Sequence, residues 1–294
     1  MGANVWADQL EIELKTPEQI GLMREAGLVV ANALAIVQDA VAPGISTGEL
    51  DAMAEESIRA AGAVPSFLGY HGYPASLCTS VNEQVVHAIP SRQQILRDGD
   101  VISIDCGADL AGWHGDAAIT VPVGHVRPGL LDMIKVAEDG MWAGIEAAAR
   151  GARSGKGRLT DISFAIQSSI RKASRYGIVE GYGGHGIGSA MHQDPFVLNH
   201  GRPGRGPRLV PGMALAIEPM LTLGKHRVAE LDDGWTVVTV DGSPAVHVEH
   251  TMAICDDGVW VTTAFDGGRS RLGDLVTHRS VKPKPLTPGR VQLP

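Results

Sequence analysis

The stretch Gly99-Asp100-Val101-Ile102-Ser103-Ile104-Asp105 has a counterpart further along the chain, Gly212-Met213-Ala214-Leu215-Ala216-Ile217-Glu218. In both stretches a glycine precedes an apolar run, an isoleucine stands directly before a carboxylate, and the two carboxylates lie 113 residues apart. Each stretch also follows a leucine at the same offset, Leu96 and Leu209. This matching indicates that the chain contains two copies of one structural unit.

Each copy has a second carboxylate in a partly apolar run. These are Asp116, in Trp113-His114-Gly115-Asp116-Ala117-Ala118, and Glu249, in Val248-Glu249-His250-Thr251. Taking a carboxylate out of water costs several kcal/mol unless a counter-charge compensates it. Four matched carboxylates on four apolar runs therefore predict a shared cationic partner, and a pair of divalent metal ions is the natural candidate.

The segments before these runs predict two helices in each half. A capping box at Thr16-Pro17-Glu18-Gln19 begins the first helix, and Ser46 with Glu49 three residues later begins the second. In the second half, helices are expected over residues 130–149 and 161–174. The fold class is therefore α+β, with a helix-helix-antiparallel strand unit repeated about a pseudo-twofold axis. We expect the sheets to face inward, the helices to lie outside and the carboxylates to meet at the centre. Duplication retained for stability alone is the competing interpretation.

The domain organisation follows from the repeat. We expect a lead-in at residues 1–15, one domain at 16–265 with halves of about 16–125 and 126–265, and a basic proline-rich tail at 266–294. The second half has roughly twenty extra residues, which suit a hairpin within 222–239 with Asp232-Asp233-Gly234 at its turn. The tail shows no clear apolar period and carries six Arg or Lys against two acids, so we expect it to be flexible and to form no part of the site.

Composition excludes several classes of protein. The net charge of −8 argues against binding to DNA, which requires a basic face. The most apolar stretch, residues 26–42, contains Asn32, Gln38 and Asp39 and is too short to cross a bilayer. The first ten residues lack the apolar core of a signal peptide. Three cysteines at no zinc-like spacing suggest free thiols in a reducing compartment. We therefore expect a cytoplasmic protein without membrane contact.

The run Gly183-Gly184-His185-Gly186-Ile187-Gly188 has two interpretations. A phosphate-binding loop would follow a strand and open a helix. Here Pro195 and a strand-like run follow, and no Lys or Ser/Thr completes such a loop. The alternative is that the glycines clear space around His185, so that its imidazole reaches a metal ion. This interpretation is favoured, and it makes the two halves unequal at this point.

Five residues thus form the predicted ligand set: Asp105, Asp116, His185, Glu218 and Glu249. Carboxylates with one imidazole suit Mn²⁺, Fe²⁺, Co²⁺ or Zn²⁺ better than Ca²⁺. Two such ions would share a hydroxide that attacks a carbonyl. His87 and His192 are further candidate functional residues, while most other histidines need no special role. Histidines that adjoin the ligands are candidates to orient them. These are His114, His247 and His250.

At this point the sequence resembles a known family, the type I methionine aminopeptidases of bacteria, which have the pita-bread fold. The resemblance runs from about Thr16 to Ala264, and its motifs occur in the family's order and spacing. They are Tyr70-His71-Gly72-Tyr73-Pro74, Ser80-Val81-Asn82-Glu83, His87-Ala88-Ile89-Pro90, His114-Gly115-Asp116, Gly184-His185-Gly186-Ile187-Gly188, Ile217-Glu218-Pro219-Met220, Asp233-Gly234-Trp235 and Glu249-His250-Thr251.

The resemblance implies a hydrolase that removes the N-terminal methionine of nascent proteins when the second residue is small. It implies that the five predicted ligands bind two divalent ions, which Asp116 and Glu249 bridge, and that His87 and His192 contact the scissile amide. A pocket for the methionine side chain is expected from Tyr70, Tyr73, Cys78, Met191 and Trp235. Met191 stands where the family often has an aromatic residue, and Phe67 where a smaller one can stand.

Further expectations concern roles and partners. Glu218 should also accept a proton from the bridging water, because it matches Asp105 by symmetry but lies on the His185 side. We expect a monomer that acts on nascent chain N-termini, with a weak, salt-sensitive contact between its basic tail and ribosomal RNA. The physiological metal is not predicted.

Three other functions compete with this one. A proline-specific aminopeptidase or prolidase of the same fold normally has a sizeable additional N-terminal domain, and about fifteen residues precede the first helix here. A non-enzymatic binding module of this fold would have lost metal ligands, whereas this chain has all five. A nucleotide-binding protein that uses the glycine run is the weakest alternative.

Overall fold

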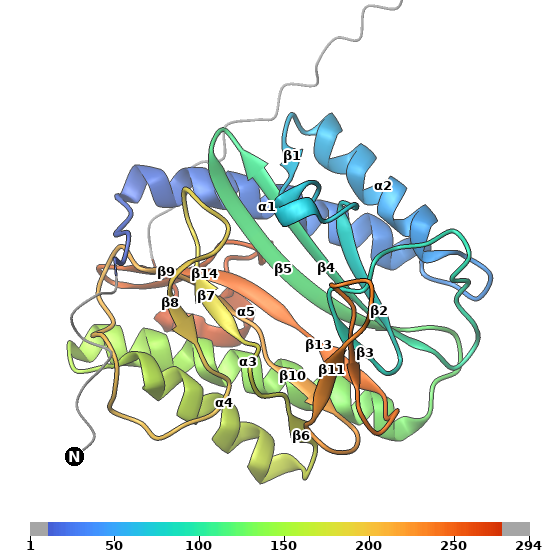
Figure 1. Cartoon of the computed structure of the whole chain (residues 1–294). Helices are drawn as coiled ribbons and strands as arrows, with labels where there is room; N and C mark the ends of the chain where they lie inside the picture. Colours follow the sequence, from blue (N-terminus) through green and yellow to red (C-terminus); the bar gives the residue numbers. More distant parts are fainter. Residues whose placement is uncertain (1–10, 278–294) are drawn as a thin grey trace, which may run out of the picture.

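The computed structural model describes residues 11–277 of the 294-residue chain. Four long helices lie on the outside of a central antiparallel sheet, two from each half of the chain (Figure 1). They are α1 (Pro17–Ala40), α2 (Thr47–Ala60), α3 (Pro128–Ser154) and α4 (Leu159–Ala173). The second helices of the two halves begin 112 residues apart, at Thr47 and Leu159, which agrees with the offset in the sequence.

Both helices of the first half begin where their capping boxes predict. The backbone N–H of Gln19 donates to Thr16 Oγ1 over 3.3 Å, and the backbone N–H of Thr16 donates to Gln19 Oε1 over 2.8 Å. In the same way, the Ser46 N–H donates to Glu49 Oε2 over 2.9 Å. Each box satisfies backbone donors that the first turn of a helix leaves unpaired.

The central sheet has nine strands, in the order β1-β4-β5-β14-β9-β7-β8, with β15 paired to β14 and β2 paired to β4. Two three-stranded sheets have the orders β13-β10-β6 and β11-β12-β3. The strands are β1 (Val64–Pro65), β2 (Leu77–Val81), β3 (Gln84–Val86), β4 (Val101–Leu110), β5 (Trp113–Pro122), β6 (Gly177–Ile178), β7 (Gly184–Gly186), β8 (Gln193–Val197), β9 (Ala214–Ile217), β10 (Met220–Thr222), β11 (Val228–Glu230), β12 (Val237–Thr239), β13 (Ala245–His247), β14 (Glu249–Cys255) and β15 (Gly258–Val261).

The two halves of the chain meet in the middle of this sheet. Strands β4 and β5 belong to the first half, strands β9 and β14 belong to the second, and β5 pairs with β14 so that Glu249 lies opposite Ala118. Each half therefore supplies two helices and a set of antiparallel strands, in the same order. This confirms the predicted α+β class and the duplicated arrangement.

The central strands have two chemically different faces. On β4, Ile102, Ile104 and Cys106 are buried in a hydrophobic cluster with residues of α1 and α2. On β9, Leu215 and Ile217 are buried in a second cluster with residues of α3 and α4. Because side chains alternate along a strand, the intervening residues point to the other side. We call these two sides the helix face and the inner face.

Helix α1 and strand β5 are in direct backbone contact. A Cβ placed on Gly115 would lie 2.7 Å from the Cα of Gly27, and a Cβ on Gly27 would lie 2.3 Å from the carbonyl oxygen of Thr262. Real Cβ atoms do not approach other heavy atoms this closely, so both positions require glycine. Glycine here serves close packing, one of its two main uses.

The predicted hairpin is present. Strands β11 and β12 are antiparallel with Val228 opposite Thr239, and the turn between them contains Asp233 and Gly234. Asp233 Oδ1 accepts from the N–H groups of Trp235 and Thr236, both over 2.8 Å. Gly234 has a φ of +75°, which a side chain would disfavour. The hairpin thus positions Trp235.

The expectation of a flexible tail from residue 266 differs from the structure as far as residue 277. Residues Arg269–Leu272 form a short helix, α5, followed by a 3₁₀ turn over Gly273–Leu275. Leu272 and Val276 are buried in the core beside α3, and the N–H of Thr277 donates to Val259 O over 2.9 Å. Two well-spaced apolar residues are enough to anchor this segment, which average composition does not reveal. The part of the predicted tail at 278–294 lies outside the described residues.

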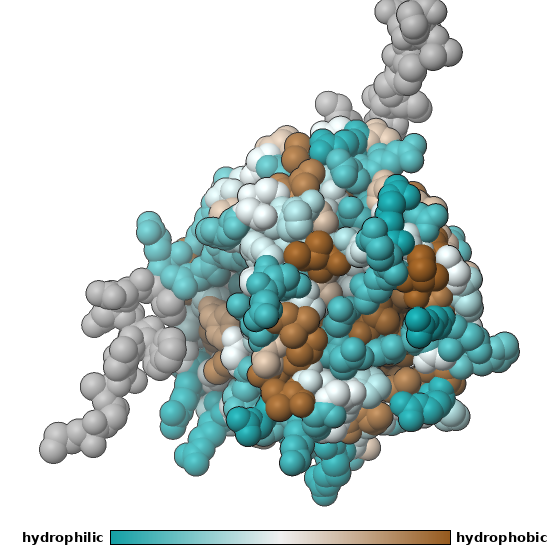
Figure 2. Space-filling view, turned by 45° about the vertical axis from the view of Figure 1, so that its right-hand side comes forward, coloured by the Kyte–Doolittle hydropathy of each residue, from teal (hydrophilic) through white to brown (hydrophobic). Residues whose placement is uncertain are grey.

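Helix α1 is long and apolar enough to cross a membrane by length and composition, but 67% of its most apolar window is buried inside the protein. It contributes Val30, Leu34 and Val37 to the cluster under β4. These contacts make it a core helix. On the face shown in Figure 2, hydrophobic side chains occur in separate groups among hydrophilic ones.

Candidate metal centre and its cavity

The strand register brings the five predicted ligands to the inner face. Residues that pair across an antiparallel ladder point to the same side, as do residues two apart on one strand. Asp105 pairs with Ala118, two residues from Asp116, and Glu249 also pairs with Ala118. Strand β9 pairs His250 with Ile217, so Glu218, the next residue, comes opposite Glu249. Gly186 pairs with Leu215, which gives His185 the same orientation as Ala216 and Glu218.

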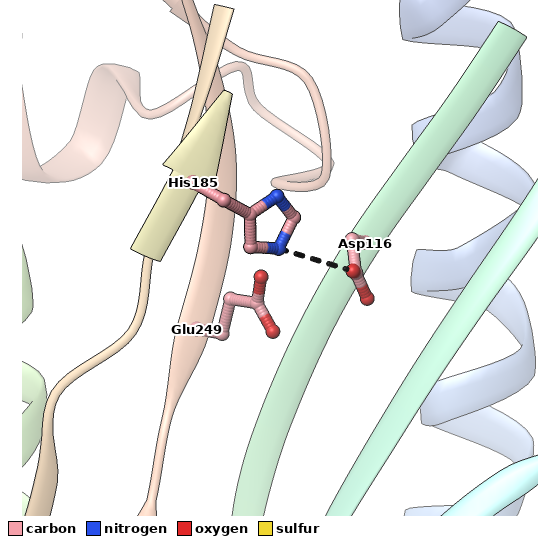
Figure 3. A group of neighbouring side chains, drawn as sticks. All are labelled: Asp116, His185 and Glu249. Atoms are coloured by element: carbon pink, nitrogen blue, oxygen red, sulfur yellow. Dashed lines mark ion pairs between the residues drawn. The ribbon is translucent and has the colours of Figure 1, made fainter. Parts of the chain in front are cut away.

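The side chains converge on His185. Its Nε2 lies 3.7 Å from Asp116 Oδ2 and 3.6 Å from Glu218 Oε1. Figure 3 shows the imidazole on β7 pointing across to Asp116 on β5, with the Glu249 carboxylate below it. Donor atoms of Asp116, His185 and Glu249 all lie within 4.8 Å of one another. This spacing allows one divalent ion to contact all three.

Strong electrostatic strain accompanies this convergence. Burial, followed by the repulsion of neighbouring carboxylates, raises the pKa of Asp116 and of Glu249 well above the usual range, and burial does the same for Glu218. Burial also raises the pKa of Asp105 to about 7, with His247 acting against it. For His185 burial acts in the opposite direction and lowers the pKa to about 3. Burial therefore opposes the charged form of every one of these groups, and a bound cation would compensate the carboxylate charge.

The unsatisfied atoms fit a cation. Among the described residues, the buried oxygens Asp105 Oδ1, Asp116 Oδ1 and Glu249 Oε1 have no hydrogen-bond partner. Buried polar atoms are nearly always paired, so each exception needs an explanation. A hydrogen-bond donor would have served one oxygen, but three acceptors in one place suit a metal ion. Carboxylate oxygens with one imidazole nitrogen are hard and borderline donors, typical of divalent transition metals.

A second imidazole lies at this centre. His247, at the end of β13, is buried, and its Nε2 lies 3.3 Å from Glu218 Oε2. Its donor atom also lies within 4.8 Å of donor atoms of Glu218 and Glu249. The sequence indicated only that His247 adjoins a ligand, because nothing in a linear pattern shows that β13 returns to the centre. His250, by contrast, points to the helix face, where its Nδ1 lies 2.8 Å from Thr263 Oγ1.

The glycines around His185 were expected to clear space for its imidazole, but the structure gives them a different role. His185 lies on the short strand β7 and not in a loop. A Cβ on Gly184 would lie 2.1 Å from the carbonyl oxygen of Ala216, and one on Gly186 would lie 2.1 Å from that of Asp194. The glycines therefore let β7 fit between β8 and β9. They clear space for neighbouring backbones, and the imidazole is positioned as a result.

His87 and His192 both line the cavity beside the five predicted ligands. His87 has a φ of +59°, uncommon for a residue with a side chain, and burial lowers its pKa to about 4. The His192 ring lies 4.3 Å from that of His185, and its Nδ1 lies 2.8 Å from the Tyr70 hydroxyl. Burial lowers the pKa of His192 as well. Both imidazoles are thus neutral near pH 7 and can donate or accept a hydrogen bond.

One cavity, of about 670 Å³, contains the centre and the predicted side-chain pocket. Its lining includes all five predicted ligands, His87, His192 and the five predicted pocket residues Tyr70, Tyr73, Cys78, Met191 and Trp235. Beside the metal centre, Tyr73, Cys78 and Met191 are buried against Phe67. The Tyr73 hydroxyl donates to the carbonyls of Leu77 and Ala88, so its ring is fixed.

The cavity is also lined by side chains for which the sequence predicted no role. They are Tyr182, Phe196 and Met220. Met220 directly follows the Glu218-Pro219 pair, and Tyr182 matches Tyr70 in the internal repeat, so both positions carried a signal. Phe67 reaches the pocket because Gly107 leaves room for it: a Cβ on Gly107 would lie 2.7 Å from the Phe67 ring.

Comparison with known proteins gives consistent relatives. The profile of metallopeptidase family M24 matches residues 21–256. Methionine aminopeptidase 1 of Mycobacterium tuberculosis (strain CDC 1551 / Oshkosh) is 52% identical over 250 residues, which cover 83% of this chain and 92% of that protein. The crystal structure of methionine aminopeptidase from Rickettsia prowazekii has a TM-score of 0.82 at 37% identity, covering 86% of this chain and 100% of that one. An Xaa-Pro dipeptidase from Bacillus anthracis has a TM-score of 0.65 at 21% identity, covering 85% of this chain and 61% of that one, which indicates a shared fold alone.

Proposed function

We propose the following division of roles from the premise that this chain belongs to metallopeptidase family M24 and is a methionine aminopeptidase, a metal-dependent hydrolase that removes N-terminal methionine. Two divalent metal ions are its cofactors. Asp105, Asp116, His185, Glu218 and Glu249, which we call the metal centre, hold these ions. Asp116 and Glu249 come from β5 and β14, the paired strands where the two halves meet, and would be shared by both ions.

The observation that carries this assignment is the set of unpaired carboxylate oxygens on the inner face. Asp105, Asp116 and Glu249 each present one to the cavity among the described residues. Divalent ions bound there would polarise the scissile carbonyl and generate the attacking nucleophile at neutral pH. Ion binding must also displace the protons that the raised pKa values retain on these carboxylates.

The remaining groups act on the substrate. Glu218 accepts the proton of the nucleophile, since its carboxylate lies between His185 and His247. His87 and His192 form hydrogen bonds to the scissile amide, and Tyr70 holds the His192 ring in place. A proton donor or acceptor of this kind contributes roughly 10²–10⁴-fold to a rate.

The methionine side chain occupies the pocket of Tyr70, Tyr73, Cys78, Met191 and Trp235. This pocket is apolar, and the Tyr73 and Trp235 rings meet edge-on with centroids 5.0 Å apart. An unbranched thioether suits such a site, because sulfur makes favourable contacts with aromatic ring edges. A small second residue, Gly, Ala or Ser, is the expected preference at the next position.

The metal-restoration assay tests both the chemistry and the specificity. Metal-stripped protein is refilled with Mn²⁺, Co²⁺, Fe²⁺ or Zn²⁺, one at a time, and release is measured on Met-Ala and Ala-Pro peptides. We expect no activity without metal and faster release from Met-Ala. Norleucine peptides should be cleaved comparably or more slowly, because one change in an apolar pocket alters binding by only about 1–3 kcal/mol. Faster cleavage of Ala-Pro would instead favour a proline-specific enzyme.

We place the reaction on nascent chains in the cytoplasm, with a monomeric enzyme and a transient contact to the ribosome. The relatives that are named methionine aminopeptidase support the action on chains that begin with methionine. Salt-dependent co-sedimentation with ribosomes, and the mass of the protein in solution, test the others.

A further inference from the structure

The loop between β7 and β8 carries two functional side chains without regular structure of its own. Met191 is buried against the pocket residues, whereas His192 lines the cavity, keeps an accessible surface and is partly enclosed by its neighbours. Between Gly188 and His192, the one backbone-to-backbone hydrogen bond to a neighbouring element within residues 11–277 runs from the His114 N–H to Gly188 O over 3.0 Å. Side-chain contacts must therefore hold the rest of this loop.

Glu13, from the segment before α1, supplies those contacts. Its Oε1 accepts from the Ser189 hydroxyl over 2.7 Å, and its Oε2 accepts from the Ser189 N–H over 3.2 Å. Glu13 Oε2 also accepts from Gln193 Nε2 over 2.8 Å. One carboxylate thus bonds both ends of the loop. Burial raises the pKa of Glu13, but these hydrogen bonds and Lys15 outweigh it and lower the pKa to about 2.

Lys15 completes the arrangement from the same segment. Its ammonium lies 3.2 Å from Glu13 Oε2 and donates to Gln193 Oε1 and to Glu13 O, each over 3.0 Å. Lys15 is only 5% exposed. A lysine is almost never buried to this extent unless it is paired. The contacts to Glu13 and Gln193 therefore offset the cost of burying the Lys15 ammonium. We call Glu13, Lys15, Ser189 and Gln193 the Glu13 clamp.

Gly188 is shaped to this clamp. A Cβ placed there would lie 2.2 Å from Lys15 Cε and 2.4 Å from Glu13 Oε2. Both atoms are at the ends of flexible side chains, so an added methyl group would displace the clamp and leave the backbone in place. This accounts for the last glycine of the Gly-His-Gly-Ile-Gly run, which the metal centre itself does not require.

The clamp acts on His192 through the neighbouring residue Gln193, whose side chain also forms part of the cavity wall. Gln193 is the first residue of β8, and successive side chains along a strand point to opposite sides. With both polar atoms of the Gln193 side chain bonded to the clamp, the preceding residue is directed toward Tyr70 and the His185 ring. A misplacement of about 1 Å in such a group can lower a rate by about 100-fold.

We propose that Glu13 and Lys15 are positioning residues that hold His192 in its catalytic orientation from outside the cavity. The inference rests on the proposed function of His192 at the scissile amide. It also assigns a role in catalysis to the segment before α1, which had been expected to be only a lead-in.

The test compares Glu13→Ala and Gly188→Ala with the matched control Glu11→Ala, an exposed glutamate two residues away on the same segment. We expect both clamp variants to lower kcat on a Met-Ala peptide by about ten-fold, with KM changed much less and with metal content close to that of the control. Glu13→Ala should also lower Tm, because it leaves the buried Lys15 ammonium without its counter-charge. In a His192→Ala background the same substitutions should add no further loss of kcat.

A structural anchor without influence on His192 would give a different result. In one outcome, the clamp variants would lower Tm while kcat stayed within roughly two-fold of the control. In the other, they would lower kcat by the same factor with and without His192. Either outcome overturns the proposal. A second readout does not depend on activity: histidine-selective ¹⁵N NMR should show the His192 resonances shifted in Glu13→Ala and unshifted in Glu11→Ala. An inactive wild-type enzyme would contradict the proposed function, while the NMR comparison would still decide the role of the clamp.

Discussion

The Glu13 clamp and the metal centre both place charged side chains inside the protein, but they treat those charges in opposite ways. In the clamp, the Glu13 carboxylate has three donors and a lysine within 3.2 Å, and its pKa is lowered. In the metal centre, carboxylates face one another, their pKa values are raised, and three of the buried oxygens have no partner among the described residues. A protein that pairs even this partly exposed carboxylate so completely leaves buried ones unpaired only where an external cation completes them.

Replacement of a bridging ligand should produce the largest effect. Asp116→Asn keeps the size of the side chain but removes the charge that holds both ions. We expect the release of methionine to fall to background, beyond the 10–100-fold typical of residues that only support ligands. Metal analysis by mass spectrometry should show fewer than two ions per chain. Retention of both ions in this variant would remove Asp116 from the metal centre.

His87→Ala separates catalysis from metal binding at the same centre. His87 lines the cavity but lies in neither of the two possible ligand groups among the described residues. We expect kcat to fall by about 100-fold to 1000-fold while both ions remain, because the imidazole stabilises the transition state and not the metals. Loss of an ion from His87→Ala would instead make it a ligand.

The pH dependence of metal-free stability should expose the unpaired carboxylates. Their folded pKa values lie above the unfolded values, so the folded state holds more protons and becomes less stable as pH rises. The buried histidines, such as His185 with its pKa near 3, have the opposite effect, but only below their unfolded pKa of about 6.5. Above that value these histidines no longer contribute, and the stability that protonated Asp105 provides is lost as pH rises through its folded pKa of about 7.

We therefore expect the Tm of the chelated protein to fall as pH rises from about 6.5 through the folded pKa of Asp105. Saturating Mn²⁺ should abolish this fall, because bound ions keep the carboxylates charged and paired. Scanning calorimetry with and without metal is the measurement. A metal-free protein whose Tm stays constant over this range would show that these carboxylates are already compensated.

Neutralising a single charge should give the smallest effects, which are changes in the free energy of unfolding. Their sign should be opposite in the metal centre and in the Glu13 clamp. In metal-free protein at pH 7.5, Asp116→Asn should raise the free energy of unfolding by about 1–2 kcal/mol, since it removes a buried carboxyl group whose ionisation is opposed by desolvation and by its neighbours. Lys15→Met should lower it by a similar amount, because Gln193 Oε1 and Glu13 lose their donor. Urea unfolding of both variants tests this. If both substitutions changed the free energy of unfolding in the same direction, the contrast between the metal centre and the Glu13 clamp would be contradicted.

The sequence predicts this architecture largely through local signals. Capping boxes mark the starts of α1 and α2, and the 113-residue offset between Asp105 and Glu218 reveals the duplicated strands. These signals suffice because alternation along a strand determines which residues share a face. The same reasoning brought the five proposed ligands together before their register was known, although their binding to metal stays a prediction.

Contacts between distant segments could not be predicted in the same way. His247 reaches Glu218, and Glu13 reaches Ser189, through a meeting of segments that no periodicity encodes. The glycines of β7 looked like space around an imidazole, because the neighbouring carbonyls of Ala216 and Asp194 are invisible in the sequence. Residues 266–277 looked flexible, since two buried apolar side chains hardly change the composition of a basic segment.

The two faces of the central strands have a consequence for how this chain can change over evolutionary time. Ile102 and Ile104 hold the first half together on one face, while Asp105 acts on the other. A substitution at an inner-face position can therefore end the chemistry without unfolding the protein. The metal-free scaffold would even be relieved of the repulsion between its carboxylates. One such substitution is the shortest path from this enzyme to a folded, inactive relative that keeps the cavity and only binds chain ends.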